Sequence, residues 1–161
     1  MKIRVGLLWC ILVVAFTGCV TVERFHEGMF QAYSRKYPWL RPHVYQICVR
    51  EAAAVELPVN LVLAVIDAES GGNSMALNPK SGARGLMQVM AVHWYPGHPE
   101  DLFLPEIGVR HGCRALKWAH GLARGNLVLT LRNYERGPRG QGINWPYTFK
   151  ILSNLNETER I

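Results

Sequence analysis

The sequence predicts an all-α fold with little or no β-sheet, in a single domain that follows a secretion signal. Three observations support this prediction. Apolar residues recur at helical spacing over most of the chain after residue 42, strand-like alternation is nearly absent, and Gly- and Pro-containing segments separate the helical stretches. With 161 residues, 49% of them hydrophobic and 19% charged, the chain has room for one packed core and not for two domains.

The first 18 residues have the pattern of a signal peptide. A short basic start precedes an apolar run from Val5 to Phe16, which is too short to span a bilayer comfortably. Small residues then lead to Cys19, as in a bacterial lipobox, although Phe16 stands where Leu is usual. We expect cleavage before Cys19 and a lipid on its sulfur; an uncleaved membrane anchor is the alternative. Either way the chain leaves the cytoplasm, and Val20 favours the outer membrane because it is not acidic.

Residues 19–42 are expected to form a membrane tether and N-terminal segment, with a short helix over 23–33, because Pro38 and Pro42 interrupt any longer helix. Further helices are expected in residues 43–161, where a proline or glycine marks several helix ends. Their expected ranges are 44–55, 58 to the glycine pair at 71–72, 106–119, 127–134 and 146–155. Residues 73–88 are rich in Gly, Asn, Ser and Pro and are expected to be irregular.

The cysteines, histidines and net charge limit the chemistry. With Cys19 taken by lipid, Cys48 and Cys113 remain in the domain, and either one disulfide or two buried free thiols fit the sequence. The six histidines form no HxxxH or HExxH pattern and no CxxC pair occurs, so no metal site is predicted. A net charge of +6 is compatible with nucleic acid, anionic lipid or an anionic polymer as partner, and does not select among them.

Glu69 is the most informative residue of the chain. It ends an apolar helix and is followed by Ser70 and two glycines. The negative end of the helix dipole disfavours an ionised carboxyl there, and apolar neighbours raise its pKa further by desolvation. These are the conditions for a general acid that keeps its proton near neutral pH. By position alone, however, an exposed glutamate at a frayed helix end is the more common outcome.

The sequence around Glu69 resembles the soluble lytic transglycosylase family, lysozyme-like enzymes that cut peptidoglycan. The segment AVIDAESG at 64–71 is followed by SGARGLMQVM at 81–90, and both motifs occur in the family's order and at suitable spacing. Three later segments are also similar: LPE at 104–106 through Gly112, YERGP at 134–138, and YTFK at 147–150. The resemblance runs from about His43 to Leu155, so it implies a single lysozyme-like catalytic domain over residues 43–161.

The resemblance also implies a reaction. Such enzymes cleave the β-1,4 bond between N-acetylmuramic acid and N-acetylglucosamine without a second carboxylate. Glu69 would give its proton to the leaving oxygen, the substrate's N-acetyl group would stabilise the charge at C1, and the muramoyl 6-hydroxyl would attack to form a 1,6-anhydro product. The implied partner is a peptidoglycan glycan strand and not nucleic acid. No cofactor is implied, and we expect a monomer.

Five further residues match family positions that line the cleft, namely Ser70, Met87, Gln88, Tyr134 and Tyr147. For Gln88, an amide that hydrogen-bonds sugar hydroxyls or an N-acetyl group is a reasonable role. For Met87, simple core filling is as plausible as substrate contact. Tyr147 is expected either to hydrogen-bond the acid or to pack beneath it.

The chain departs from the family pattern at two positions that usually hold Asn. Gly108 replaces the first, which we interpret as a structural change. Glu135 replaces the second, and the favoured interpretation is an outward-pointing surface residue. The alternative is that Glu135 reaches the cleft and alters pH dependence or product choice. Asp67 is a poor candidate for a second carboxylate, because two residues along a helix rotate about 200° and its side chain points away from that of Glu69.

Aromatic and basic residues add weaker indications. Trp94, Tyr95 and Trp145 could stack on sugar rings, although tryptophans in a small domain more often belong to the core. Arg132, Arg136 and Arg139 are candidates to attract the anionic peptide stems, or are simply a solvated face.

Three functions therefore compete. The first is a lipid-anchored lytic transglycosylase that faces the periplasm. The second is a lysozyme-type hydrolase on the same fold, with Glu135 or a water-positioning group supplying the base. The third is a non-catalytic glycan-binding or assembly lipoprotein, against which the retention of Glu69 argues.

Overall fold

The computed structural model describes residues 26–137 and 141–158, so the signal segment and Cys19 lie outside the described residues. The chain divides into two compact units, Met1–Pro38 and Trp39–Ile161. In the first, residues 26–36 are helical, three residues beyond the expected end at 33. A search of the described residues finds no helix with the length and apolar character of a membrane span.

The second unit is built from helices, which confirms the predicted fold class. It contains α2 (Pro42–Ala54), α3 (Val59–Glu69), α4 (Ala91–Trp94), the 3-10 helix η1 (Pro99–Phe103), α5 (Pro105–Leu122), α6 (Leu127–Arg136) and α7 (Trp145–Thr158). The five longer helices fall where helical spacing predicts them, within a few residues at each end. Helices α4 and η1 were not predicted, because with four and five residues they are too short for a periodic apolar pattern.

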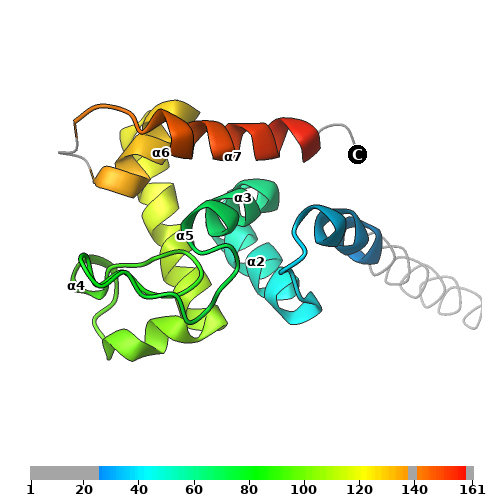
Figure 1. Ribbon diagram of the computed structural model, residues 1–161, viewed down its shortest axis with the longest axis horizontal. Helices are drawn as coiled ribbons and strands as arrows, with labels where there is room; N and C mark the ends of the chain where they lie inside the picture. Colours follow the sequence, from blue (N-terminus) through cyan, green and yellow to red (C-terminus); the bar gives the residue numbers. More distant parts are fainter. Residues whose placement is uncertain (1–25, 138–140, 159–161) are drawn as a thin grey trace, which may run out of the picture. The chain divides into compact units, whose positions relative to one another are not determined.

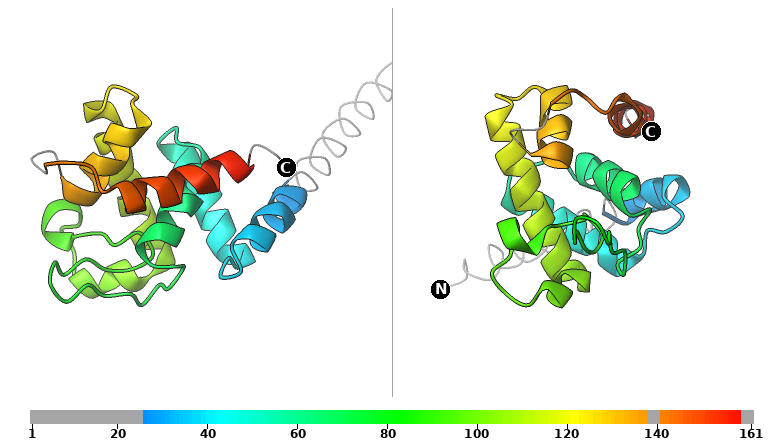
Figure 2. Two further views of the ribbon diagram at one scale, coloured as in Figure 1. Left: turned by 45° about the horizontal axis from the view of Figure 1, so that its top comes forward. Right: turned by 60° about the vertical axis from the view of Figure 1, so that its left-hand side comes forward.

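Two helices supply the centre of this unit. Residues Leu61–Ile66 of α3 are all buried, and α5 buries the stripe of Val109, Cys113, Leu116 and Ala119 that its sequence predicts. Helix α5 packs against α2, α6 and η1, whereas α3 packs against α2 and α7. In Figure 1 and in the right-hand view of Figure 2, α7 and the long loop after α3 lie on opposite sides of α3.

The loop over residues 70–90 has no regular helix or strand, as predicted, but its shape is fixed by backbone pairing. Isolated antiparallel bridges join Leu77 to Arg84 and Arg84 to Val89. Gly85 has φ +76°, and a side chain there would collide with the backbone oxygen of Leu102. The loop is therefore held against the chain just before α5.

The same close approach explains Gly108, where the family pattern has Asn. A Cβ at this position in the first turn of α5 would lie 2.6 Å from the carbonyl oxygen of Leu102. The packing of η1 on α5 thus leaves no room for a side chain. This agrees with a structural change at Gly108.

The two cysteines of the domain are free thiols in the structure. Cys48 on α2 and Cys113 on α5 are both fully buried. Burial raises the pKa of both thiols, that of Cys113 to about 12, and the neighbouring Cys113 adds to the rise at Cys48. Of the two alternatives that the sequence left open, the structure has the free thiols, which behave as small apolar side chains.

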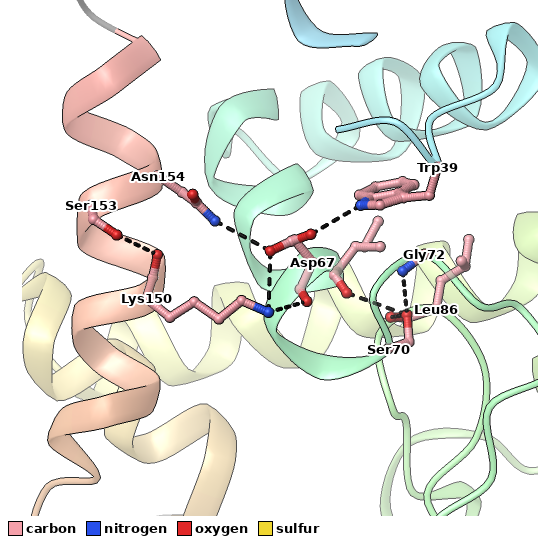
Figure 3. Close-up of polar contacts among 9 residues, drawn as sticks. Trp39, Asp67, Ser70, Gly72, Leu86, Lys150, Ser153 and Asn154 are labelled. Atoms are coloured by element: carbon pink, nitrogen blue, oxygen red, sulfur yellow. Dashed lines mark hydrogen bonds and ion pairs between the residues drawn. The ribbon is translucent and has the colours of Figure 1, made fainter. Parts of the chain in front are cut away.

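Asp67 fastens α7 to α3 on the side of α3 that Figure 3 shows. Its carboxylate accepts a hydrogen bond from Trp39 Nε1 at 3.0 Å and one from Asn154 Nδ2 at 3.4 Å. Lys150 Nζ lies 3.2 Å from the same carboxylate and donates to the backbone oxygen of Asp67 at 2.6 Å. Two residues of α7 and the first residue of the second unit thus meet at one carboxylate, which we call the Asp67 clamp.

We predict that Asp67→Ala destabilises the protein by about 1–3 kcal/mol, because the Trp39 and Asn154 donors lose their acceptor and Lys150 loses its ion-pair partner. Urea unfolding followed by circular dichroism measures the change. The control is Glu56→Ala, which breaks an ion pair of an 88% exposed side chain and should change stability little. Equal unfolding midpoints for Asp67→Ala and the wild type would contradict the clamp.

Candidate active site

Glu69 lies at the wall of a cleft of about 900 Å³ in the second unit. The cleft is lined by residues of the loop at 78–90 and of α3, α4, α5, α6 and α7. Glu69 is the last residue of α3, so the helix delivers its carboxyl to the cleft from an entirely buried apolar segment. The geometry agrees with the predicted place of the acid, and the exposed, frayed helix end that position alone favoured is not what the structure shows.

The environment of Glu69 favours its protonated form. Burial raises the pKa of the carboxyl from about 4.5 to about 7. A hydrogen bond donated by Tyr147 Oη to Glu69 Oε1, 2.7 Å long, lowers the pKa, and the negative charge of Glu135 raises it. Glu69 is therefore close to half-protonated at neutral pH, so it can both give and accept a proton there.

Two tyrosines flank the acid from the C-terminal helices. Tyr147 of α7 hydrogen-bonds Glu69 directly, which is one of the two arrangements that the sequence left open. Tyr134 of α6 lines the same cleft, and its hydroxyl donates to the carbonyl oxygen of Met87 at 2.7 Å. Burial and the nearby Glu69 carboxyl raise the pKa of both phenols well above the ordinary value, so both remain hydrogen-bond donors.

Gln88 lines the cleft with a restrained amide. Its Nε2 donates to the carbonyl oxygens of Ala76 and Gly85, at 3.1 Å each, and its backbone has φ +48°. Both hydrogens of the amide nitrogen are thus engaged with the loop. The side-chain carbonyl oxygen is the group that remains to accept a hydrogen bond from a ligand.

Ser70 and Met87 serve the scaffold. The Ser70 hydroxyl lies 2.8 Å from the carbonyl oxygen of Leu86 and accepts from the N–H of Gly72, which ties the end of α3 to the loop (Figure 3). Met87 is 0% exposed and packs on Gly112 of α5. Of the two roles that the sequence left open for Met87, its complete burial supports core filling rather than substrate contact.

Glu135 overturns the favoured interpretation from the sequence. It lines the cleft together with Glu69 and is close enough to act on its charge, so it does not point outward. Its Oε1 accepts a hydrogen bond from Asn144 Nδ2 at 2.6 Å. Helical spacing could have indicated this, because Glu135 follows the fully buried Leu131 by four residues and therefore lies on the inward face of α6.

One of the three aromatic candidates lies in the cleft. Trp94 lines it, together with Trp118 of α5, which the sequence analysis did not single out. Their rings form an edge-to-face pair with centroids 5.3 Å apart. Tyr95 instead donates to Asp101, and Trp145 stacks on Phe149 away from the cleft. Trp118 does not belong to the buried stripe of α5. A tryptophan outside such a stripe could have been recognised from the sequence as a candidate for the surface of a cleft.

Of the basic candidates, Arg136 lines the cleft and pairs with Glu135, with Nε 3.5 Å from Oε2. Arg132 donates to the neighbouring Asn133, and Arg139 lies outside the described residues. Among residues 26–137 and 141–158, no three His, Cys, Asp or Glu side chains are grouped as a metal site would need.

Comparisons with known proteins agree with this arrangement. A family model described as the transglycosylase SLT domain matches residues 47–147. No curated protein sequence matches the chain. Two solved structures share its fold with a TM-score of 0.55 each. They are an inactive mutant of the lytic transglycosylase Slt from Pseudomonas aeruginosa, 22% identical, and the 70 kDa soluble lytic transglycosylase SLT70 from Escherichia coli, 24% identical.

The shared region is a small part of both relatives. The match covers 79% of this chain and 23% of Slt, and 78% of this chain and 20% of SLT70. At these identities the structural likeness establishes the fold.

The raised pKa of Glu69 predicts how stability depends on pH. The unfolded carboxyl ionises near pH 4.5 and the folded one near 7, so the folded protein binds more protons between these values. The free energy of unfolding that Glu69 contributes therefore falls as pH rises from 4.5 to 7. The side chain that replaces Glu69 in Glu69→Gln does not titrate. The free energy of unfolding of this variant, relative to that of the wild type, should therefore rise by roughly 1–3 kcal/mol from pH 4 to pH 8. Urea unfolding at both pH values measures this gain.

The matched control for this measurement is Glu56→Gln, the same chemical change at an exposed side chain. It should follow the wild type at both pH values. A constant difference between Glu69→Gln and the wild type from pH 4 to 8 would show that Glu69 is not buried in its protonated form.

Proposed function

The chain belongs to the transglycosylase SLT domain family, and we propose that it is a lipid-anchored lytic transglycosylase of peptidoglycan. The bond cleaved is the β-1,4 link between N-acetylmuramic acid and N-acetylglucosamine, and the product is a 1,6-anhydro sugar. The observation that carries the proposal is Glu69 itself, a carboxyl with a pKa of about 7 on the wall of a large cleft.

In the first half of the reaction, Glu69 gives its proton to the oxygen of the leaving sugar. The leaving group departs poorly as an alkoxide, so this proton removes much of the barrier. As the bond breaks, the substrate's own N-acetyl group stabilises the positive charge at C1. Tyr147 hydrogen-bonds the carboxylate that forms on Glu69, which supports the proton transfer.

In the second half, ionised Glu69 takes the proton of the muramoyl 6-hydroxyl, whose oxygen attacks C1. Because the attacking group belongs to the same sugar, no entropy is lost in recruiting a water molecule. Glu69 regains the proton that it gave away. One carboxyl with a pKa near 7 can perform both transfers.

The walls of the cleft suit a sugar chain. Trp94 and Trp118 present flat apolar surface, which fits the C–H faces of pyranose rings. The free carbonyl oxygen of Gln88 can accept from a hydroxyl or an acetamido N–H. Tyr134 lines the same wall. In our proposal Gln88, Tyr134 and Tyr147 are the substrate-binding residues of the predicted set, and Ser70 acts by holding the loop.

A lysozyme-type hydrolase is the second candidate, because Glu135 brings another carboxyl group to the cleft. Many glycosidases use two carboxylates, one as acid and one as base or nucleophile. A hydrolase releases reducing ends, whereas a lytic transglycosylase releases anhydro ends. A non-catalytic glycan-binding protein would release neither, and it has no use for a glutamate whose pKa is raised to about 7.

We predict that Glu69→Gln lowers the clearing of purified cell walls by at least ~100-fold, because general acid–base catalysis contributes factors of that size or more. Mass spectrometry of the wild-type digest should show anhydro-muropeptides. Circular dichroism verifies that the variant is folded. Substantial clearing by folded Glu69→Gln would refute the mechanism, and a wild-type digest that contains only reducing ends would favour the hydrolase.

The N-terminal segments complete the proposal. Residues 1–18 are a signal peptide, Cys19 carries the lipid, 19–42 tether the domain, and 43–161 form the catalytic domain. The apolar run that ends in small residues before Cys19 supports this arrangement. The domain would then face the periplasm from the outer membrane, within reach of the cell wall.

We predict that Cys19→Ala removes the anchor. In cells supplied with labelled palmitate, the wild type should carry label and sediment with membranes, because acyl chains bind bilayers through their buried methylenes. Cys19→Ala should carry no label. The matched control is Cys10→Ala, which changes a cysteine inside the apolar run and should still be labelled. Equal labelling of the wild type and Cys19→Ala would contradict the lipobox.

A further inference from the structure

Glu135 has two polar neighbours at the cleft. Asn144 Nδ2 donates to its Oε1 at 2.6 Å, and Arg136 Nε lies 3.5 Å from its Oε2. Its side chain is 24% exposed, and it lines the cleft beside Glu69. Two carboxyl groups that arrive from α6 and α3 thus share one cavity, although they are 66 positions apart in the chain.

The charge of Glu135 is incompletely neutralised. Its Oε2 is buried and accepts no hydrogen bond in the described part of the chain. Arg136 is 42% exposed and also donates from Nη1 to the carbonyl oxygen of Gln141, so solvent and a backbone group share its charge. A carboxylate in this state can still act on the charge of Glu69, whose pKa it raises.

Other titratable and charged groups also lie near Glu69. The phenols of Tyr134 and Tyr147 are neutral, and Lys150, which shares a shallower hollow with Glu69, is paired with Asp67. The remaining titratable and charged residues on the cleft and on the shallower hollow beside Glu69 are His93, Lys80 and Arg136. Of these, Arg136 is already paired with Glu135.

We propose that Glu135 is a positioning residue that acts through Glu69: its ionised carboxylate, fixed by Asn144 and Arg136, holds the catalytic proton on Glu69. This inference rests on the proposed function. It assigns a role to the glutamate that stands where the resembled family usually has a neutral asparagine. A negative charge on the same cleft disfavours the ionised form of Glu69 and so favours the proton on it.

The proposed role has a consequence for pH dependence. A general acid works only while it is protonated, so activity falls as pH rises through the titration of Glu69. An anionic neighbour delays that fall to higher pH. The chain would therefore remain active nearer to neutrality than it would with asparagine at this position.

The test compares the wild type with Glu135→Gln in two measurements. The first is the titration midpoint of Glu69, followed by the carboxyl-carbon NMR signal of ¹³C-labelled glutamate and assigned with Glu69→Gln. The second is kcat/KM for cell-wall fragments against pH. We expect both midpoints to move about half a pH unit or more toward acid in Glu135→Gln. At pH 7.5 the rate should fall about threefold or more, and at pH 5 it should change little.

Three variants make the result specific. Glu135→Asp keeps the charge and should titrate like the wild type. Glu135→Asn repeats the neutral substitution with the family's usual residue, and it takes the place of Glu135→Gln if circular dichroism shows that variant unfolded. Glu56→Gln, a remote exposed carboxyl, should move neither midpoint.

The possible results separate this inference from the function on which it rests. An unchanged Glu69 midpoint in both neutral variants overturns the role of Glu135, even if the wild type cleaves peptidoglycan. A uniform loss of rate with unmoved midpoints also overturns it, because that is the effect of a purely structural change. If the Glu69 midpoint differs between the wild type and the neutral variants but the wild type cleaves no peptidoglycan, the coupling between Glu135 and Glu69 stands and the proposed transglycosylase activity is refuted.

Discussion

The hydrogen bond from Tyr147 to Glu69 is the contact on which the rest of the site depends. It joins two residues 78 positions apart, one at the start of α7 and one at the end of α3. Without α7 in place the carboxyl would lose this donor and part of its covering. Two residues earlier on α3, the Asp67 clamp holds α7 in that position. Two acids near the end of α3 thus both contact α7 and have separate tasks, Asp67 in holding the helix and, in the proposed reaction, Glu69 in proton transfer.

Much of the fold could be predicted from the sequence because its helices have strong apolar stripes. The buried residues of α5 recur every three to four positions, and Pro58 and the glycines at 71–72 bound α3 closely. Helices α4 and η1 have no such stripe, since they span little more than one turn each. Their shapes follow from tertiary contacts that no local pattern encodes, such as the approach of Leu102 to Gly85 and Gly108.

The site was less predictable than the fold, and the reasons differ between residues. Glu69 could be found because motif and physical environment agree. Glu135 was misjudged because charged residues near a helix end are usually solvated, whereas here Asn144 and Arg136 enclose it. Met87 and Ser70 belong to motifs that surround the acid, but their side chains turn to α5 and to the loop. A motif identifies the residues near a reaction, and only the geometry separates those that touch the ligand from those that support them.

Trp39 contacts the chain on both sides of Glu69. It is the first residue of the second unit, its indole hydrogen-bonds Asp67, and its ring lies so close to Gly72 that no side chain would fit there. These two contacts lie on either side of Glu69 in the sequence. The indole therefore fastens the chain just before and just after Glu69, and a smaller side chain at position 39 would loosen both the last turn of α3 and the start of the loop that follows it.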